Sequence, residues 1–571
     1  MNKRLLLALA LSAAVIGLTQ YFFPPATPKP VAKVAAPAGG AGALAPGAAT
    51  GGTTLGTTVG PAAIADSAAV TGIDTTTITG RTATWRLSSV GAAPVSVQLA
   101  GYKALDERGK TDRPVELVRA GERLMSWQLV LREATGNRTI DLSRVPFATT
   151  RVDDRTVRYA ATVGALNVAI TYTFVPDSFL ARVGGQVTGL TTPAVLQFAL
   201  PSGLASAEAD TLEDQRQLAV AAKPTRENAT SVAYGKLDPG EKQLVEGPLT
   251  WVASKSKFFV AGFLTMEGDR PFDEAEVTGG PLVGKVESHV NAVVRQRLEN
   301  GQFRFELYAG PQEWRRLVAL GRDFEHSNPY GGWLQGFVQP FARIVMRALL
   351  WMHESLRLEY GWVLVIFGIT VRLLLWPFNQ KAMRSSMKMQ AIQPELQAVQ
   401  DKHKADPQKM QAEVMRVYKE HGMSPFSALS GCLPMLIPMP VFITLFFVFQ
   451  NTIEFRGVPF LYLNDISQRD HTFIIPILMA ASAYALSWIG MRGMPPNPQA
   501  KMMGYVFPAM MFVFFWSAAA GLNLYYMVQN IAALPQQWLI ARERQKNPKP
   551  GAAAAATVMA ANGRPAQPKK R

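Results

Sequence analysis

One arginine, Arg372, interrupts an otherwise apolar stretch that runs from Gly361 to Phe378. A guanidinium keeps its charge in proteins, so burying it in hydrocarbon costs from a few to more than about ten kcal/mol, depending on the reference state. No acidic residue in the stretch could neutralise it. The side chain therefore either faces a water-filled cavity or reaches the headgroups beyond Phe378, about 9 Å further along a helix. The stretch alone leaves both interpretations open.

Polar side chains also recur in other apolar stretches of the C-terminal half. Ser482 lies within residues 473–490, and Asn523 and Tyr526 lie within residues 520–540. Such groups could bond neighbouring helices or line a hydrated groove with the arginine, and spacing alone does not separate these roles. None of the apolar stretches contains Asp or Glu. This disfavours a pump or a cation-coupled transporter, because both usually rely on carboxylates within the membrane.

The composition narrows the class of protein. The chain has 571 residues, a net charge of +16 and 48% hydrophobic residues, so it is too long for one domain and more apolar than an ordinary soluble protein. Its one cysteine, Cys432, cannot form an intrachain disulfide, and six histidines without ligand spacing disfavour a zinc site. The sequence contains no phosphate-binding or metalloprotease motif. We expect no metal, no cofactor and no catalytic residues.

The first 75 residues predict an anchor and a linker. Residues 1–23 carry Lys3 and Arg4 before a long apolar run, which is typical of a signal peptide or of an uncleaved anchor. The aromatic residues before Pro24 resemble an interfacial belt and favour an anchor whose N-terminus is cytoplasmic. Residues 24–75 consist mainly of Ala, Gly, Pro and Thr, a composition that predicts a flexible linker.

Residues 76–320 predict an antiparallel β-sandwich. Apolar residues alternate with polar or small ones in Val168–Phe174 and Gln302–Leu307, the period of strands with one buried face. Turn-rich breaks such as Gly184-Gly185 and Asp238-Pro239-Gly240 separate these runs. Sandwiches of this size often bind sugars, but no convincing acid–base pair is present. A structural or docking module is the preferred interpretation.

The remaining chain predicts membrane helices. Residues 333–355 carry Arg343 and Arg347 opposite aromatic residues, which favours an amphipathic helix in the interface. The predicted core, residues 361–541, contains five spans, at about 361–378, 432–450, 473–490, 503–517 and 520–540. Lys and Arg concentrate in the loop 381–430 and in the tail 542–571, which places both in the cytoplasm and the sandwich outside.

The loop 381–430 predicts a helical hairpin. Apolar residues recur at helical spacing on both sides of a break at Asp406-Pro407. Methionines such as Met383 and Met387 give one edge an adaptable apolar surface. This stripe either joins the two helices or binds varied partners, and the sequence does not decide between the two.

Several motifs together resemble a known family. In the C-terminal half they are Gly361-Trp362, Val371-Arg372, Trp376-Pro377, Met387–Gln390, Gln393–Leu396, Gly431–Phe442, Arg456–Phe460, Asp465–Ser467 and Gly521–Tyr526. This set resembles the YidC/Oxa/Alb family of membrane protein insertases. The earlier region resembles the periplasmic part of the Gram-negative form at Trp251–Ala253, Lys257–Phe259 and Leu307–Pro311. The resemblance implies an α-helical membrane protein with a five-span core, an N-terminal anchor span and a periplasmic all-β supersandwich in the bacterial inner membrane.

The resemblance also implies a non-enzymatic mechanism. Family members hold a hydrophilic groove in the inner half of the bilayer, open to cytoplasm and lipid, and the arginine of the groove corresponds to Arg372. The residues implied to contact the substrate are Met439, Phe442, Phe514 and Tyr526, and the expected polar lining is Thr370, Ser482 and Asn523. Where some members have a polar residue one turn before the arginine, this chain has Gly368. That departure suggests a shallower groove.

The implied partners are nascent membrane proteins, components of the Sec translocon, membrane lipids and, through the basic tail and the cytoplasmic loops, the ribosome. No specific nucleic-acid partner is expected. Two other functions stay open at this stage. One is a membrane-anchored carbohydrate-binding or carbohydrate-modifying protein that acts through the sandwich, which paired carboxylates in a cleft would favour. The other is a small-solute channel, which a water path through both leaflets would favour.

Overall fold

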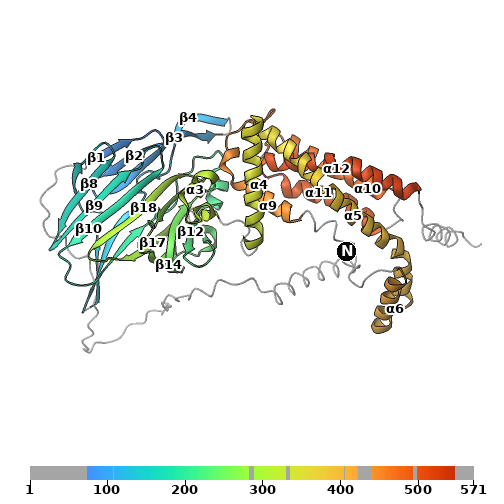
Figure 1. The fold of residues 1–571 in the computed structure, drawn as a ribbon, viewed down its shortest axis with the longest axis horizontal. Coiled ribbons are helices and arrows are strands. Elements are labelled where there is room, and N and C mark those ends of the chain that lie inside the picture. Colours follow the sequence, from blue (N-terminus) through green and yellow to red (C-terminus); the bar gives the residue numbers. More distant parts are fainter. Residues whose placement is uncertain are drawn as a thin grey trace, which may run out of the picture. The chain divides into compact units, whose positions relative to one another are not determined.

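The structure, a computed structural model, describes residues 74–106, 109–134, 136–281, 289–328, 335–403, 406–421, 439–492 and 498–546 (Figure 1). It divides into two units, residues 1–329 and residues 330–571, which we call the β unit and the helical unit. The predicted anchor 1–23, nearly all of the linker 24–75 and the tail beyond residue 546 lie outside the described residues.

Two antiparallel sheets form the β unit. The smaller sheet has the order β1-β2-β3-β4, with bounds Thr75–Thr79, Ala83–Ser88, Ala93–Asp106 and Gly109–Glu116. The larger sheet follows the order β6-β5-β11-β17-β16-β14-β15-β18-β10-β9-β8-β7, and β12 and β13 branch from β14. Its strands are β5 (Ser126–Glu133), β6 (Gly136–Asp141), β7 (Ala148–Arg151), β8 (Thr156–Val163), β9 (Leu166–Phe174), β10 (Leu180–Thr188), β11 (Ala194–Ala199), β12 (Ala219–Pro224), β13 (Thr230–Ala233), β14 (Lys242–Lys255), β15 (Phe259–Leu264), β16 (Phe272–Gly279), β17 (Val290–Arg297) and β18 (Gln302–Pro311).

The alternating residues form the core of this unit, as their period predicts. Along β9, Val168, Ile170 and Tyr172 are buried, whereas the residues between them are partly exposed. Aromatic rings fill the interior, with the Phe198 and Phe305 rings stacked at 4.8 Å between centroids and Trp127 beside both. These rings bury large apolar areas, and aromatic pairs add about 0.5–1.5 kcal/mol each beyond that burial.

The glycine pair predicted to break two strands lies instead inside one. Gly184 and Gly185 belong to β10 and pair with β9 and β18. A Cβ on Gly185 would overlap the Phe303 ring and the Ala169 carbonyl. Glycine is required there because a neighbouring strand and ring approach the backbone closely, not because the chain turns.

Short helices complete the β unit. They are α2 (Thr211–Arg216), η1 (Tyr234–Lys236), α3 (Trp314–Leu320) and η2 (Phe324–Ser327). The unit extends past the predicted end at residue 320, because the Phe324 ring packs 5.3 Å from Trp251 and 5.6 Å from Tyr308. The Trp251 indole also donates a hydrogen bond of 3.0 Å to the Arg322 carbonyl.

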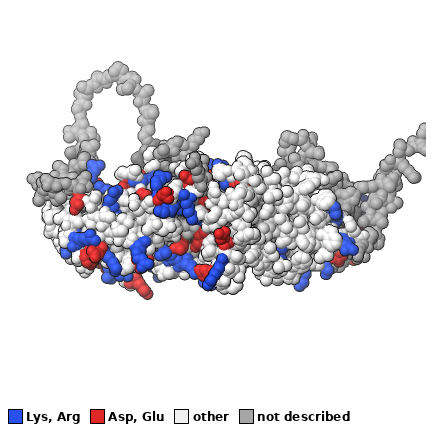
Figure 2. All heavy atoms as spheres, turned by 90° about the horizontal axis from the view of Figure 1, so that it is seen from above, with Lys and Arg blue, Asp and Glu red and all other residues white. Residues whose placement is uncertain are grey.

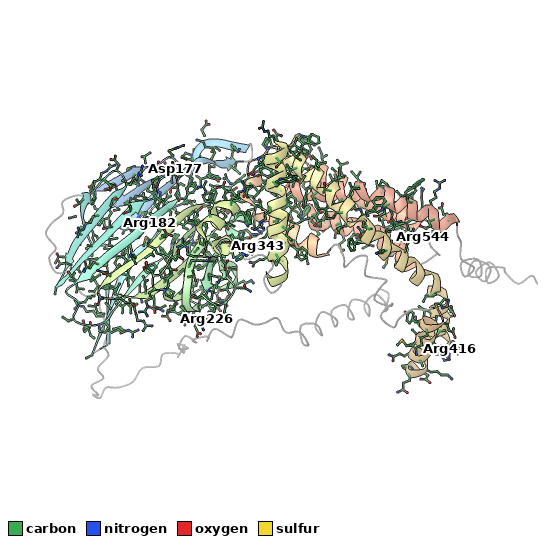
Figure 3. The ribbon with its side chains drawn as sticks, viewed as in Figure 1. Asp177, Arg182, Arg226, Arg343, Arg416 and Arg544 are labelled. Carbon is green, nitrogen blue, oxygen red and sulfur yellow. The ribbon has the colours of Figure 1, made fainter. Side chains whose placement is uncertain are left out.

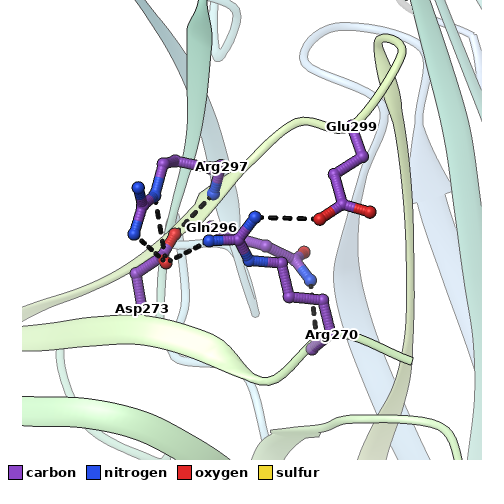
Figure 4. A network of polar contacts seen from close by, with 5 residues as sticks. All are labelled: Arg270, Asp273, Gln296, Arg297 and Glu299. Carbon is purple, nitrogen blue, oxygen red and sulfur yellow. Dashed lines mark hydrogen bonds and ion pairs between the residues drawn. The ribbon is translucent and has the colours of Figure 1, made fainter. Parts of the chain in front are cut away.

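A polar network joins β16 to the end of β17 (Figure 4). The Asp273 carboxylate accepts hydrogen bonds from the Arg297 backbone N–H at 2.6 Å and from Arg270 Nη2 at 3.1 Å. Arg270 also donates to Glu299 at 2.9 Å, and Gln296 donates to the Arg270 carbonyl at 3.3 Å. Exposed ion pairs of this kind contribute at most about 1 kcal/mol each, so the network mainly fixes where β17 ends.

A buried lysine makes the stability of the β unit depend on pH. Lys255, at the end of β14, is 4% exposed, and burial lowers its pKa from the ordinary 10.5 to about 8 although the Asp214 carboxylate opposes the shift. Above pH 8 the folded chain loses this proton while the unfolded chain keeps it, so unfolding takes up a proton and stability rises with pH until about 10.5.

We expect the free energy of unfolding of the isolated β unit to rise by up to about 3 kcal/mol over this window, since one unit of pKa difference is worth about 1.4 kcal/mol. Urea denaturation at several pH values checks this, with Lys255→Met as the comparison. The free energy of unfolding of the variant should lack that rise. If it changed with pH as steeply in the variant as in the wild type, another group would be responsible for the titration.

The helical unit contains eight described elements. They are α4 (Gln335–Leu356), α5 (Tyr360–Lys402), α6 (Pro407–Glu420), α9 (Met439–Asn451), η4 (Ile453–Phe455), α10 (Ile474–Met491), α11 (Pro498–Phe515) and α12 (Ala520–Lys546). Among the described helices, two stretches are long and apolar enough to cross a membrane, Tyr360–Lys381 and Ile474–Met491, and Gly504–Phe515 is a shorter apolar stretch. Figure 2 shows a broad uncharged band over this unit, with basic side chains near one of its ends.

The first predicted span and the first helix of the predicted hairpin are one helix. Helix α5 continues from Tyr360 to Lys402 without ending at residue 378. Asp406 then caps α6 by accepting a hydrogen bond from the Lys409 N–H at 3.1 Å, with Pro407 as the first helical residue. Buried Ile392, Leu396, Val417 and Tyr418 form the seam between the two helices. These four apolar residues therefore join the helices, as one of the two interpretations predicts.

Candidate functional site

Helices α5 and α12 approach each other closely at Gly368. A Cβ there would lie 3.1 Å from Val528 Cγ1, which is tighter than an ordinary contact. The Gly368 carbonyl accepts a hydrogen bond of 2.9 Å from Gln529 Nε2. The departure noted in the sequence thus has a packing reason, and a glutamine of α12 brings a polar group to this position.

Arg372 reaches across to the same helix one turn later. Its Nη2 donates a hydrogen bond of 2.9 Å to Gln536 Oε1, and Gln536 Nε2 donates to the Trp376 carbonyl at 3.1 Å. Gln536 is completely buried, whereas Arg372 is half-buried. The amide therefore bridges the guanidinium to the backbone of α5. This contact directs the arginine toward α12 instead of along α5 to the headgroups.

The depth of this pair follows from the helix geometry. Both helices begin beside the segment 453–470, where the Trp362 and Phe460 rings pack at 5.4 Å and the Ala520 N–H donates to the Gln468 carbonyl at 2.7 Å. Arg372 lies twelve residues after Tyr360, or about 18 Å, and Gln536 sixteen residues after Ala520, or about 24 Å. Both distances exceed half of a hydrocarbon core of about 30 Å.

Aromatic and apolar side chains pack densely in the other half. The Tyr525 ring lies 6.0 Å from Phe367 and 5.9 Å from Phe449, and Phe449 stacks on Phe455 at 5.2 Å. Phe449 and Phe455 are each 1% exposed. Between this cluster and Arg372, Gln529 Nε2 donates a hydrogen bond of 2.8 Å to the Tyr525 hydroxyl. The bundle is thus apolar and closed at one end and polar toward the other.

The three expected lining residues have separate roles. Asn523 is buried and donates to the Phe515 carbonyl at 3.0 Å, which closes the turn between α11 and α12. Thr370 is exposed and donates to the Ile366 carbonyl of its own helix at 2.8 Å. Ser482 is buried and accepts a hydrogen bond of 3.1 Å from Asn530, so it joins α10 to α12. Gln529 and Tyr525 lie between Arg372 and the closed end, whereas Gln536 contacts Arg372 from the other side, next to the Trp376 carbonyl.

The residues expected to contact substrate are only partly described. Phe514 is 62% exposed near the end of α11, and Tyr526 is half-buried with its ring 5.4 Å from Phe515. Met439 and Phe442 lie in the first turn of α9, and their side chains are outside the described residues. Sequence reasoning missed Gln536. It lies seven residues, or two turns, after Gln529, a spacing that places two glutamines on one helix face.

The β unit contains a cavity of about 330 Å³. Its lining residues are Arg119, Ala120, Leu204, Ala205, Ser206, Asp214, Gln215, Leu218 and His289. Asp214 is the one carboxylate among them, and it accepts a hydrogen bond of 3.1 Å from the Lys257 N–H. A glycoside-cleaving site needs two carboxylates, one acid and one base or nucleophile. The lining of this cavity does not supply such a pair.

Two family descriptions cover most of the chain. The "YidC periplasmic domain" matches residues 75–344, and the "60Kd inner membrane protein" matches residues 351–547. The membrane protein insertase YidC of Chlorobaculum tepidum is 30% identical over 540 residues, which are 87% of this chain and 86% of that protein. This chain belongs to the YidC family of membrane protein insertases. It is an inner-membrane YidC insertase with a periplasmic domain, and it inserts membrane proteins without an enzymatic reaction.

A second curated relative agrees with this assignment. The YidC insertase of Burkholderia vietnamiensis is 31% identical over 392 residues, 66% of this chain and 67% of that protein. A crystal structure described as an active YidC insertase with its first transmembrane domain resolved is 16% identical, with a TM-score of 0.32, over 81% of this chain and 92% of that one. In this YidC chain the β unit is the periplasmic domain, so the ends of α5 and α12 beyond Arg372 and Gln536 face the cytoplasm.

Proposed function

We propose that the Arg372–Gln536 pair is the polar centre of a groove through which this insertase passes the hydrophilic segments of nascent membrane proteins. The hydrogen bond between these two side chains carries the proposal, because it holds a permanent positive charge in the cytoplasmic half of the bundle. Burial of a guanidinium is tolerable where water and polar partners reach it. Gln536 and the Trp376 carbonyl supply part of that polar environment.

The charge would act on acidic residues of the substrate. An Asp or Glu in a translocating tail must cross the hydrocarbon, and a fixed cation in the inner leaflet shortens the unfavourable part of that path. The packed aromatic cluster around Tyr525 and Phe449 closes the periplasmic end. Because that end is closed, the tail does not cross through the groove alone. It crosses to the periplasm when the apolar segment of the substrate partitions into lipid, and the hydrophobic effect and the membrane potential drive this step.

The apolar segment of the substrate would move along the lipid-facing side of α9 and α11. Met439, Phe442, Phe514 and Tyr526 are the proposed contacts, and the high exposure of Phe514 supports its inclusion. A photo-crosslinking amino acid at Phe514 or Tyr526 tests this path in ribosome-bound insertion intermediates. Adducts with the apolar segment of the nascent chain should form at both positions.

Position Ile477 provides the matched control for this crosslinking. It is an apolar residue of α10, 53% exposed, on a helix without proposed contacts. Adducts at Phe514 should exceed those at Ile477 severalfold. Equal labelling at both positions would mean that the substrate contacts lipid-facing side chains indiscriminately, and the proposed path would be wrong.

The periplasmic domain should be largely dispensable for insertion itself. Deletion of most of residues 76–300 leaves the bundle contacts of Arg372 and Gln536 intact, because every partner in that network belongs to the helical unit. We expect insertion of single-span substrates in depletion cells to stay within about twofold of wild type. Complete loss of insertion by a deletion variant that still accumulates in the membrane would contradict this division of roles.

Two partners complete the proposal. The exposed faces of the periplasmic domain would dock components of the Sec translocon, and the basic tail 542–571 together with the hairpin of α5 and α6 would meet the ribosome. Positive charge near the membrane supports the second assignment, because ribosomal RNA is strongly anionic.

A further inference from the structure

Four segments that are distant in the sequence meet at the cavity of the β unit. Its lining comes from the chain after β4, the chain after β11, helix α2 and the residue before β17, and it includes Arg119, Ala205, Asp214 and His289. The Ala205 N–H donates a hydrogen bond of 3.0 Å to the Leu117 carbonyl, which joins the first two segments. The volume of about 330 Å³ is that of a small-molecule site, and such sites are usually preformed in the folded chain.

The guanidinium of Arg119 has hydrogen-bond donors that the protein does not use. Its Nε donates to the Leu204 carbonyl at 3.3 Å. Neither terminal nitrogen has a hydrogen-bond partner among the described residues, and Nη1 is buried. A buried N–H without an acceptor is unfavourable, so a ligand that supplies one gains affinity. A carboxylate is the acceptor that a guanidinium binds best through two N–H groups.

The other charged groups at the cavity are opposed by charges of the protein. Asp214 is the one carboxylate of the lining, and it interacts with the ammonium group of the buried Lys255. The Glu122 carboxylate, which does not line the cavity, lies 3.8 Å from Nε2 of His289. Arg119 forms no ion pair with any carboxylate in the described part of the chain. The lining therefore contains one positive charge that lacks an acidic partner.

We propose that this cavity binds a small molecule that carries a single carboxylate on an apolar body. Arg119 binds the carboxylate, and Leu204 and Leu218, each 2% exposed, contact the apolar body. A phosphate monoester carries up to about two negative charges at pH 7, so one unpaired arginine favours the monoanion. The site lies entirely within the β unit and shares no residue with the groove around Arg372.

Saturation-transfer difference NMR of the full-length protein in nanodiscs of a zwitterionic lipid, titrated with benzoate, tests the proposal. Benzoate should bind saturably, with empty nanodiscs as the background. Benzamide has the same ring without the charge, and phenyl phosphate has more charge, so both should bind more weakly. Arg119→Gln should weaken benzoate binding about tenfold, the effect of losing a hydrogen bond to a charged group.

Arg226→Gln is the matched control, because Arg226 is an exposed arginine in the turn after β12 (Figure 3). It should bind benzoate as the wild type does. Ala205→Leu provides a second test that keeps the guanidinium of Arg119. The larger side chain fills part of the cavity, so this variant should also bind benzoate more weakly.

Three results would overturn the proposal. The first is the absence of saturable benzoate binding to the wild type, or equal affinity of the wild type and Arg119→Gln for benzoate. The second is tighter binding of phenyl phosphate than of benzoate, since the site would then select a phosphate. The third is unchanged benzoate binding by Ala205→Leu, which would place the ligand outside the cavity.

Discussion

Replacement of Arg372 by alanine should reduce insertion of single-span substrates with acidic translocated tails about tenfold, the effect of losing about 1.5 kcal/mol from an interaction with a charged group. Arg372→Lys should retain most of the activity. Lysine keeps a positive charge at the same depth, although it cannot reproduce the planar guanidinium that bonds Gln536. The expected result depends on charge and only weakly on shape.

Insertion in depletion cells, followed by protease protection of the translocated tail, measures this effect. Substrates whose tails lack Asp and Glu provide the internal control and should be affected much less by Arg372→Ala. Arg416→Ala, on an exposed face of α6, should behave as wild type. Full insertion of acidic-tailed substrates by Arg372→Ala would remove the electrostatic role proposed for the groove.

Substitutions of Gln536 distinguish the effect of where Arg372 is held from the effect of its charge. Gln536→Leu leaves the Trp376 carbonyl and one guanidinium N–H without their partner, which should destabilise the bundle by about 1–3 kcal/mol and lower insertion together with thermal stability. Gln536→Glu offers a carboxylate to Arg372 at the same place. That variant should keep its thermal stability but lose insertion of acidic-tailed substrates, because the new carboxylate cancels the positive charge.

Thermal unfolding of the purified protein and the insertion assay should be measured on the same variants. Asn530→Leu is the matched control, since Asn530 is a half-buried polar residue of α12 that bonds Ser482 of α10 and not Arg372. Asn530→Leu should lower the thermal stability of the protein. Any loss of insertion should be the same for substrates with and without acidic tails. If Gln536→Glu inserted acidic-tailed substrates as well as the wild type does, net charge at this site would not govern insertion.

Local patterns in the sequence predicted much of the fold. The alternation along residues 168–174 predicted a buried strand face, and the Asp406-Pro407 break predicted the start of a helix, because each pattern depends only on neighbouring residues. The motifs from Gly361-Trp362 to Gly521–Tyr526 predicted the family, which the comparisons confirm. The turn predicted at Gly184-Gly185 is wrong, because glycine occurs both in turns and where strands approach closely, and the Phe303 ring that requires glycine here is distant in the sequence.

The amino-acid sequence is enough to show that a permanent charge lies within an apolar helix and that none of the predicted spans contains a carboxylate. The residue that this charge contacts is set by the packing of the helices. Gln536 is 164 positions away from Arg372, and Gln529 meets Gly368 over a similar separation. Periodicity reports which side of a helix a residue occupies, whereas a partner on another helix depends on how the two helices pack, which no local pattern encodes.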